Sequence, residues 1–177
     1  MIFLLELFFL TNIKNVFHFI LLMSTLKYVA ALVTVEDIAV SRQFYEKILG
    51  LRVTTDYGEN VTFNEGFSIH KKSHFASLVS NLPITSGGNN FELYFEYDDI
   101  DQLQVLLEEN NVQFVHKCIE QPWRQKGIRF YDPDHNMIEV GEPLPHVAKR
   151  LLVEGNDINT ISQILMTPKE IIEIWLK

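Results

Sequence analysis

The sequence is poor in cysteine, glycine and proline, and each shortage excludes a class of protein. Its 177 residues include one cysteine, eight glycines and six prolines. The single thiol, Cys118, has no partner for an internal disulfide and lacks the Cys/His spacing of a zinc ribbon, so we expect a reducing, cytoplasmic location. The glycine and proline counts are too low for collagen-like or low-complexity sequence.

Positive charge is also scarce. Fifteen Lys and Arg residues face 23 Asp and Glu residues, which gives a formal net charge of −8, and no basic run stands out. We therefore expect no nucleic-acid partner. Hydrophobic residues make up 47% of the chain and include thirteen phenylalanines, so it contains enough apolar material for one compact domain with a small appendage.

The chain lacks an apolar run long enough to span a membrane. Residues 2–10 and 16–23 are strongly apolar, but neither reaches the roughly 20 residues that a transmembrane helix needs. The first run carries Glu6 and lacks the positively charged start of a signal peptide. We interpret Met23 as the true start and residues 1–22 as an extension outside the fold. A membrane-associating or export segment and a packed N-terminal helix are the alternatives.

The rest of the chain repeats one pattern twice. In the first copy, the apolar run 28–35 predicts a buried strand, and Asp37 is a good N-cap for a helix that Gly50 ends. Three short strands are expected to follow. They are residues 51–57, 61–63 and 67–70, which are separated by turn residues.

The second copy begins after a loop at residues 80–90. An alternating strand at 91–97 precedes a helix capped by Asp98-Asp99. Three strands are again expected, at residues 112–115, 127–131 and 137–140, and the last two are joined by the turn Asp132–Asn136. Asp37 falls on Asp99 at an offset of 62 residues. The sequence thus predicts an α+β fold of two βαβββ modules that form a curved mixed sheet, with a cup lined by both halves.

Two stretches resemble a known family. Residues 44–50 (FYEKILG) resemble the first-module signature of the vicinal oxygen chelate superfamily, and residues 132–140 (DPDHNMIEV) resemble its closing hairpin. That superfamily includes glyoxalases, extradiol dioxygenases and bleomycin-resistance proteins. The resemblance covers about residues 26–142, so we assign residues 23–142 to a glyoxalase-like domain and residues 143–177 to a C-terminal helical extension.

The resemblance implies a metal site in the cup. The positions that match the family's ligands are Ala30, His70, Glu92 and Glu139. Ala30 carries no donor atom, which leaves His70, Glu92 and Glu139 as the candidate ligands. One imidazole and two carboxylates suit a divalent Mn, Fe, Ni or Zn ion. Strand parity places Glu92 on one face with Tyr94. Glu139 is also the candidate catalytic base.

Each candidate ligand has a simpler interpretation. Glu139 could be an edge carboxylate paired with Arg or Lys, Glu92 a solvated residue, and His70 an exposed strand residue beside Lys71-Lys72. Three further side chains are candidates for substrate binding. Tyr94 could supply a pocket hydroxyl, while Trp123 and Arg124 could form an aromatic and cationic lid or, equally, a packing Trp with a solvated Arg.

The C-terminal extension is predicted to be helical at residues 146–154 and 158–165. A third helix is expected to run to Lys177 from a capping box at residues 167–170. The pattern is similar to a helix-turn-helix, but basic and acidic residues are balanced here. We expect the extension to pack on the domain or across a homodimer interface.

Three functions follow from these observations. The first is a metal-dependent lyase, isomerase or dioxygenase that acts on a small molecule with two adjacent oxygens. The second is a metal-free small-ligand-binding protein of the bleomycin-resistance type. The third is a regulator whose C-terminal extension binds DNA.

Overall fold

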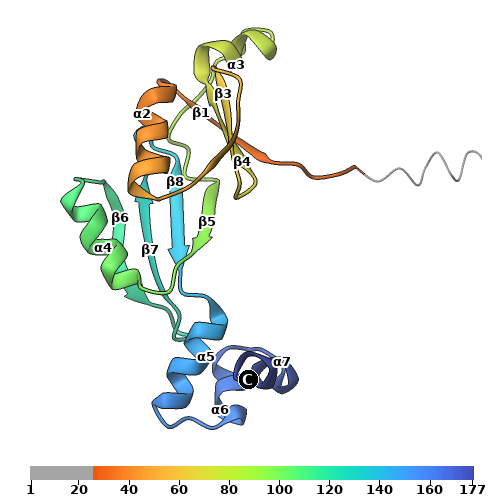
Figure 1. Ribbon diagram of the computed structural model, residues 1–177, viewed down its shortest axis with the longest axis vertical. Coiled ribbons are helices and arrows are strands. Elements are labelled where there is room, and N and C mark those ends of the chain that lie inside the picture. The colour runs from red at the N-terminus through yellow and green to blue at the C-terminus, as the bar shows by residue number, and fades with distance from the viewer. Residues whose placement is uncertain (1–25) are drawn as a thin grey trace, which may run out of the picture. The chain divides into compact units, whose positions relative to one another are not determined.

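The computed structural model describes residues 26–177, and the interpretation of residues 1–22 lies outside the described residues. Residues Ala31–Lys177 form one compact unit (Figure 1). Within the described part of the chain, no helix is long and apolar enough to cross a membrane.

Module 1 is a four-stranded mixed sheet with the strand order β1-β4-β3-β2. The outer strand β1 runs parallel to β4, and the other neighbours are antiparallel. The strands are β1 (Ala31–Val35), β2 (Val53–Asp56), β3 (Asn60–Phe63) and β4 (Phe67–Lys71).

The helix of module 1 changes type halfway. It begins as α2 (Ile38–Arg42), and the Asp37 side chain accepts hydrogen bonds from the Ala39 and Val40 amides, which confirms the predicted N-cap. It continues as a π-helix, η1 (Gln43–Ile48). Gly50 then turns the chain with a φ of +70°, a conformation that favours glycine.

Module 2 repeats this topology with the strand order β5-β8-β7-β6. Its helix is α4 (Ile100–Glu109), and Asp99 caps it by accepting a hydrogen bond from the Gln102 amide, as predicted. The strands are β5 (Glu92–Glu96), β6 (Phe114–Glu120), β7 (Lys126–Tyr131) and β8 (Met137–Gly141). Two four-stranded mixed sheets with interspersed helices confirm the predicted α+β class and the duplicated module.

One helix was not expected. Residues Lys72–Leu78 form α3 directly after β4, and no side chain caps its N-terminus. The sequence pattern carries no start signal for this helix, because Lys71 at its N-cap offers no acceptor.

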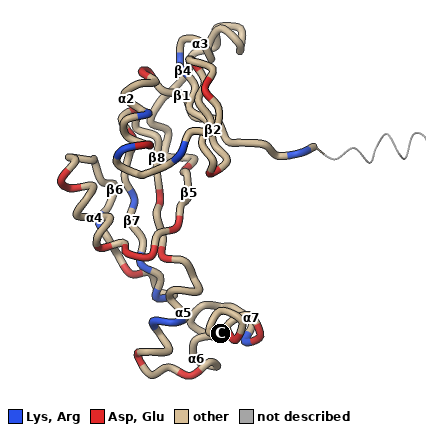
Figure 2. The backbone as a smooth tube through the Cα atoms, in the orientation of Figure 1, with Lys and Arg blue, Asp and Glu red and all other residues tan. Residues whose placement is uncertain are grey.

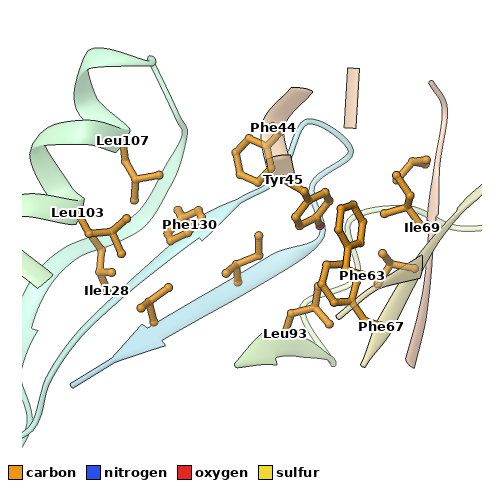
Figure 3. Close-up of a cluster of buried hydrophobic side chains, with 14 of the residues drawn as sticks. Phe44, Tyr45, Phe63, Phe67, Ile69, Leu93, Leu103, Leu107, Ile128 and Phe130 are labelled. Carbon is orange, nitrogen blue, oxygen red and sulfur yellow. The ribbon is translucent and has the colours of Figure 1, made fainter. Parts of the chain in front are cut away.

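A core shared by the two modules joins them. Phe44 of η1 packs against Phe130 of β7, with ring centroids 6.4 Å apart (Figure 3). Phe67 of β4 packs against Phe95 of β5, with ring centroids 5.9 Å apart. Tyr45 is fully buried, and its hydroxyl donates a hydrogen bond of 2.8 Å to Asp132 in the turn before β8. The predicted turn therefore also holds module 1 in place.

The C-terminal extension has three helices and a small core of its own. They are α5 (Leu144–Val153), α6 (Ile158–Ile164) and α7 (Lys169–Trp175). Ile161 and Ile172 are fully buried in that core. The predicted capping box at residues 167–170 is wrong: Pro168 is the N-cap of α7, and the Thr167 hydroxyl donates to the Leu165 carbonyl instead. Figure 2 shows charges of both signs on the extension.

Candidate functional site

The polar face of the module 2 sheet carries three of the six predicted site residues, Glu92, Tyr94 and Glu139. In the strand register Tyr94 lies opposite Glu139, Glu139 opposite Arg129, and Arg129 opposite His116, so all four side chains share one face. Glu92 joins them because it lies two residues before Tyr94 on β5. The apolar residues of the same strands face the core on the other side.

Arg129 connects the two predicted carboxylate ligands. Its Nε donates to Glu92 Oε2 at 3.0 Å, and its Nη2 donates to Glu139 Oε2 at 2.5 Å. His116 Nε2 lies 3.4 Å from Arg129 Nη1. We name Glu92, His116, Arg129 and Glu139 the carboxylate–guanidinium cluster. Two carboxylates and one guanidinium give it a formal charge of −1 when His116 is neutral.

The carboxyl groups of Glu92 and Glu139 differ in pKa because their surroundings differ. The Arg129 hydrogen bond lowers the pKa of Glu92. Burial raises the pKa of Glu139, and the neighbouring Glu92 carboxylate adds to that rise. The Glu139 side chain is the more enclosed of the two, with 18% of its surface exposed against 34% for Glu92. Glu139 is therefore the group of this pair that is better placed to take up a proton.

Tyr94 and Trp123 belong to one chain of hydrogen bonds next to this cluster. Gln125 Nε2 donates to the Tyr94 hydroxyl at 3.3 Å, and the Trp123 indole N–H donates to Gln125 Oε1 at 2.9 Å. Gly141 makes room for this arrangement, because a Cβ there would lie 3.0 Å from the Tyr94 hydroxyl oxygen. The structure thus links the two predicted substrate-binding aromatics through Gln125, which the sequence analysis did not select.

Arg124 is held by the C-terminal extension. Its guanidinium pairs with Glu120 at 2.6 Å and with Glu154 at 3.1 Å, just after the end of α5. Arg150 of α5 pairs in turn with the buried Glu142 at 2.8 Å. These ion pairs attach the extension to module 2, and they engage the positive charge of Arg124, which the sequence analysis considered for a cationic lid.

His70 lies in a different cluster, on the module 1 sheet. It is buried, and its Nε2 is 2.8 Å from Nδ1 of His74 in α3. Its Nδ1 is 3.2 Å from Asn60 Nδ2, and His74 Nδ1 is 3.3 Å from Glu59 Oε2. Burial and the neighbouring His74 lower the pKa of His70. We name these four residues the histidine cluster.

Strand register explains why His70 and Glu139 are not equivalent. When Asp37 is matched to Asp99, Ala31 corresponds to Leu93. Ala31 pairs with Phe67, and Leu93 pairs with Ile138. The position that corresponds to Glu139 is therefore Ser68, and His70 lies two residues further along β4.

The chain does not by itself assemble the predicted set of metal ligands. Among residues 26–177, no group of three or more His, Cys, Asp or Glu side chains is placed to hold a metal ion. Glu92 and Glu139 are brought together, but by a guanidinium; His70 belongs to the other sheet; and Ala30, just before β1, has no donor. The residues of one chain therefore do not fit the metal that the resemblance implies.

Arg129 and His116 are the members of the cluster that sequence reasoning passed over. Arg129 stands between Ile128 and Phe130, both fully buried, so strand parity alone places it on the polar face. That signal was available in the sequence. Its two carboxylate partners were not, because they depend on which strands are neighbours.

Comparison with known proteins agrees with the fold. The sequence model of the glyoxalase-like domain matches residues 28–145. The chain is 28% identical over 115 residues to the uncharacterized protein YraH of Bacillus subtilis, an alignment that covers 60% of this chain and 90% of that protein. It is 34% identical to a structure from Agrobacterium tumefaciens described as a protein of unknown function, with a TM-score of 0.62 over 70% of this chain and 98% of the other.

A glyoxalase/dioxygenase from Nostoc punctiforme is also similar in structure. Its TM-score is 0.52 at 25% identity, over 66% of this chain and 91% of the other. The family match spans both modules, so a single domain family accounts for the strand order and for the repeated module. The chain belongs to the glyoxalase-like domain family.

Proposed function

We propose that this protein binds a small organic molecule at the carboxylate–guanidinium cluster, without a resident metal ion. The single observation that carries the proposal is the position of Arg129 between Glu92 and Glu139. A guanidinium in that place contacts both carboxylates and neutralises one of their two negative charges, in the position that a metal ion would have to occupy. It also uses one oxygen of each for charge-assisted hydrogen bonds.

The cluster indicates what kind of molecule it takes. Its formal charge is −1, and Glu139 retains an oxygen that Arg129 does not contact. A ligand that presents an amine, amide or hydroxyl hydrogen to this oxygen would be favoured over a second carboxylate. The half-exposed ring of Tyr94, connected through Gln125 to the Trp123 indole, offers an apolar contact for the rest of the molecule.

Glu139 has the properties of a proton-exchanging group. Burial and the neighbouring Glu92 carboxylate raise its pKa above that of an ordinary glutamate, and the hydrogen bond from Arg129 holds the side chain in place. If the bound molecule is transformed, we assign the proton transfer to Glu139 Oε1 or Oε2.

The metal-dependent lyase or dioxygenase is the second candidate. It is supported by the carboxylates of Glu92 and Glu139 on one face, and by the glyoxalase/dioxygenase description of the Nostoc punctiforme protein. For this candidate, Arg129 would have to move away from Glu92 and Glu139, and His70 would have to come from a second copy of the chain.

The outer strands β1 and β5 offer edges for such a second copy. Each has a neighbouring strand on one side only, and each carries an exposed side chain, Leu32 on β1 and Tyr94 on β5. The second candidate thus requires the homodimer that the sequence analysis expects.

Elemental analysis of protein purified without chelator or a histidine tag tests the choice. We expect far less than one Mn, Fe, Ni or Zn ion per chain in the wild type, and no saturable uptake on titration with Zn²⁺ or Ni²⁺. The matched variant is Arg129→Gln, which removes the guanidinium and frees both carboxylates while keeping a polar, unbranched side chain on the strand. About one metal ion per wild-type chain, lost together in Glu139→Gln and His70→Ala, would overturn the proposal in favour of the enzyme.

A further inference from the structure

A cavity lies on the face of the module 2 sheet opposite the carboxylate–guanidinium cluster. It has a volume of about 770 Å³ and opens between the end of η1 and helix α4. Its floor includes Phe95 of β5 and Val140 of β8. Both residues neighbour the carboxylate–guanidinium cluster in sequence but point the other way, because successive strand residues alternate between faces. The floor of the cavity therefore lies on the face opposite the cluster. Glu96 also lines the cavity, but the same alternation places it on the polar face, where the Tyr94 hydroxyl donates to its Oε1 at 3.5 Å.

The walls of this cavity are mostly apolar. Val105 is half-exposed and Leu106 is also exposed, both on α4, so this side of the helix is not covered by other described residues. The remaining apolar walls come from both modules: Ile48, Leu49, Leu51, Phe95, Leu103 and Val140. Ligand pockets have volumes of about 300–1,000 Å³ and are lined in this way.

The π-helix shapes the wall contributed by module 1. The Leu49 amide donates to the Phe44 carbonyl at 3.1 Å, a five-residue spacing, and the Leu51 amide donates to the Tyr45 carbonyl at 2.9 Å. This wide last turn leads into Gly50, which redirects the chain. Single π-turns within helices are often found at functional sites.

The rim of the cavity is acidic. Glu65, Glu96 and Glu109 face a single cation, Lys47, which gives a formal charge of −2. The ion pairs formed within residues 26–177 include none of these four side chains. An apolar floor under an unneutralised acidic rim favours a molecule with an apolar body and a positively charged head, and disfavours a fatty acid of the same length.

We propose that this cavity is a second binding site, for a small cationic amphiphile with an amine head group. The apolar chain lies against Phe95, Leu103 and Leu106, and the ammonium group lies at the glutamates of the rim. This site uses none of the cluster residues on the other face, so it is independent of the proposed function.

Two probes with similar alkyl chains and head groups of opposite charge test the proposal: n-octylamine and octanoate, titrated into the full chain by calorimetry. We expect saturable binding of one octylamine per chain, about tenfold tighter than any binding of octanoate. Val105→Trp fills the cavity from an exposed position and should abolish this binding. Val153→Trp is the matched control, because Val153 is 89% exposed on α5, outside the cavity. Thermal unfolding checks that both variants are folded.

Charge is tested separately from shape. Glu65→Gln with Glu109→Gln should remove most of the preference for octylamine over octanoate. The matched control, Glu170→Gln with Glu173→Gln, removes two exposed carboxylates on α7, outside the cavity, and should leave that preference unchanged. Absence of saturable binding, equal affinity for the two probes, or full binding in Val105→Trp would each overturn the proposal. So would a wild-type dimer that Val105→Trp dissociates, since a second copy of the chain would then cover this surface.

Discussion

The two modules have the same strand order but carry different chemistry on their polar faces. In each, the first strand pairs in parallel with the last. Module 1 has Ser68 at the position that corresponds to Glu139, and its buried histidine lies two residues further along. Module 2 concentrates charge in one cluster around Arg129. A duplicated topology therefore preserves the sheet without preserving the site, because a site depends on which side chains the register places together.

The turns before the last strands differ in the same way. The module 1 turn at residues 64–66 contacts its own sheet, through the Asn64 side chain and the Arg52 amide. The corresponding turn of module 2 reaches across the junction: Asp132 accepts from the Tyr45 hydroxyl, and Asp134 accepts from the Glu36 amide. Module 2 thus supplies both the candidate site and the polar contacts that join the modules.

The largest expected effect is at this junction. Tyr45→Ala removes a fully buried ring that packs on Phe44, Phe63 and Phe67. We expect the free energy of unfolding to fall by about 3–5 kcal/mol, measured by urea denaturation. Tyr57→Ala is the control, because 77% of Tyr57 is exposed. Similar losses in both variants would show that the shared core does not stabilise the junction.

Asp132→Ala compares the two turns directly. Asp132 is buried and accepts hydrogen bonds from the Tyr45 hydroxyl, two backbone amides and the Asn136 side chain. Its loss leaves these donors without an acceptor, so we expect about 2–3 kcal/mol of destabilisation. Asn64→Ala in the module 1 turn should cost less than about 1 kcal/mol. If the Asn64 variant were the less stable of the two, the junction would not depend on the module 2 turn.

The sequence was sufficient for the features that depend on local chemistry. Asp37 and Asp99 cap their helices, and residues 132–136 form a turn, because each depends on residues within four positions. Local chemistry could not predict that Ser68, rather than His70 two residues further along β4, occupies the position that corresponds to Glu139. A shift of two residues keeps every side chain on its own face, so the alternating pattern is the same in both registers. Only the pairing of β1 with β4 distinguishes them.

In the candidate site too, local sequence patterns predicted some features, while others depend on which strands pair. Period-two alternation correctly placed Glu92 and Tyr94 on one face of β5. The alternative interpretation of Glu139, an edge carboxylate paired with Arg or Lys, agrees with its contact to Arg129. It is wrong about the edge, because β8 lies between β5 and β7. Whether the cluster ever exchanges Arg129 for a metal stays a prediction, since it depends on atoms outside the chain.

Arg129→Gln tests the charge difference between the modules. The ion pairs are partly exposed, so we expect a loss of only about 1 kcal/mol at neutral pH. The Glu92 pKa is lowered in the folded protein, so its contribution to stability is present near neutral pH and is lost as the pH falls through that pKa. The Glu139 pKa is raised, so that group favours the folded state at low pH and loses this effect as the pH rises through its folded pKa.

Carboxyl ¹³C shifts, followed by NMR over a pH titration, measure both groups. In the wild type we expect Glu92 to titrate below the ordinary glutamate range and Glu139 above it. In Arg129→Gln both midpoints should move up, because the guanidinium favours the charged form of each carboxylate. Coincident midpoints in the wild type would contradict the assignment of Glu139 as the proton-exchanging group.

The smallest expected effect compares the two helix caps. Asp37 accepts hydrogen bonds from two amides at the start of α2, whereas Asp99 accepts one at the start of α4. Asp37→Ala should therefore cost about 1 kcal/mol and Asp99→Ala about half as much. Asparagine can also accept these bonds, so Asp37→Asn and Asp99→Asn should recover most of each loss in urea denaturation. If asparagine recovered nothing, the negative charge at the helix N-terminus rather than the hydrogen bond would stabilise each helix, and the difference between the modules in bond number would carry no energetic weight.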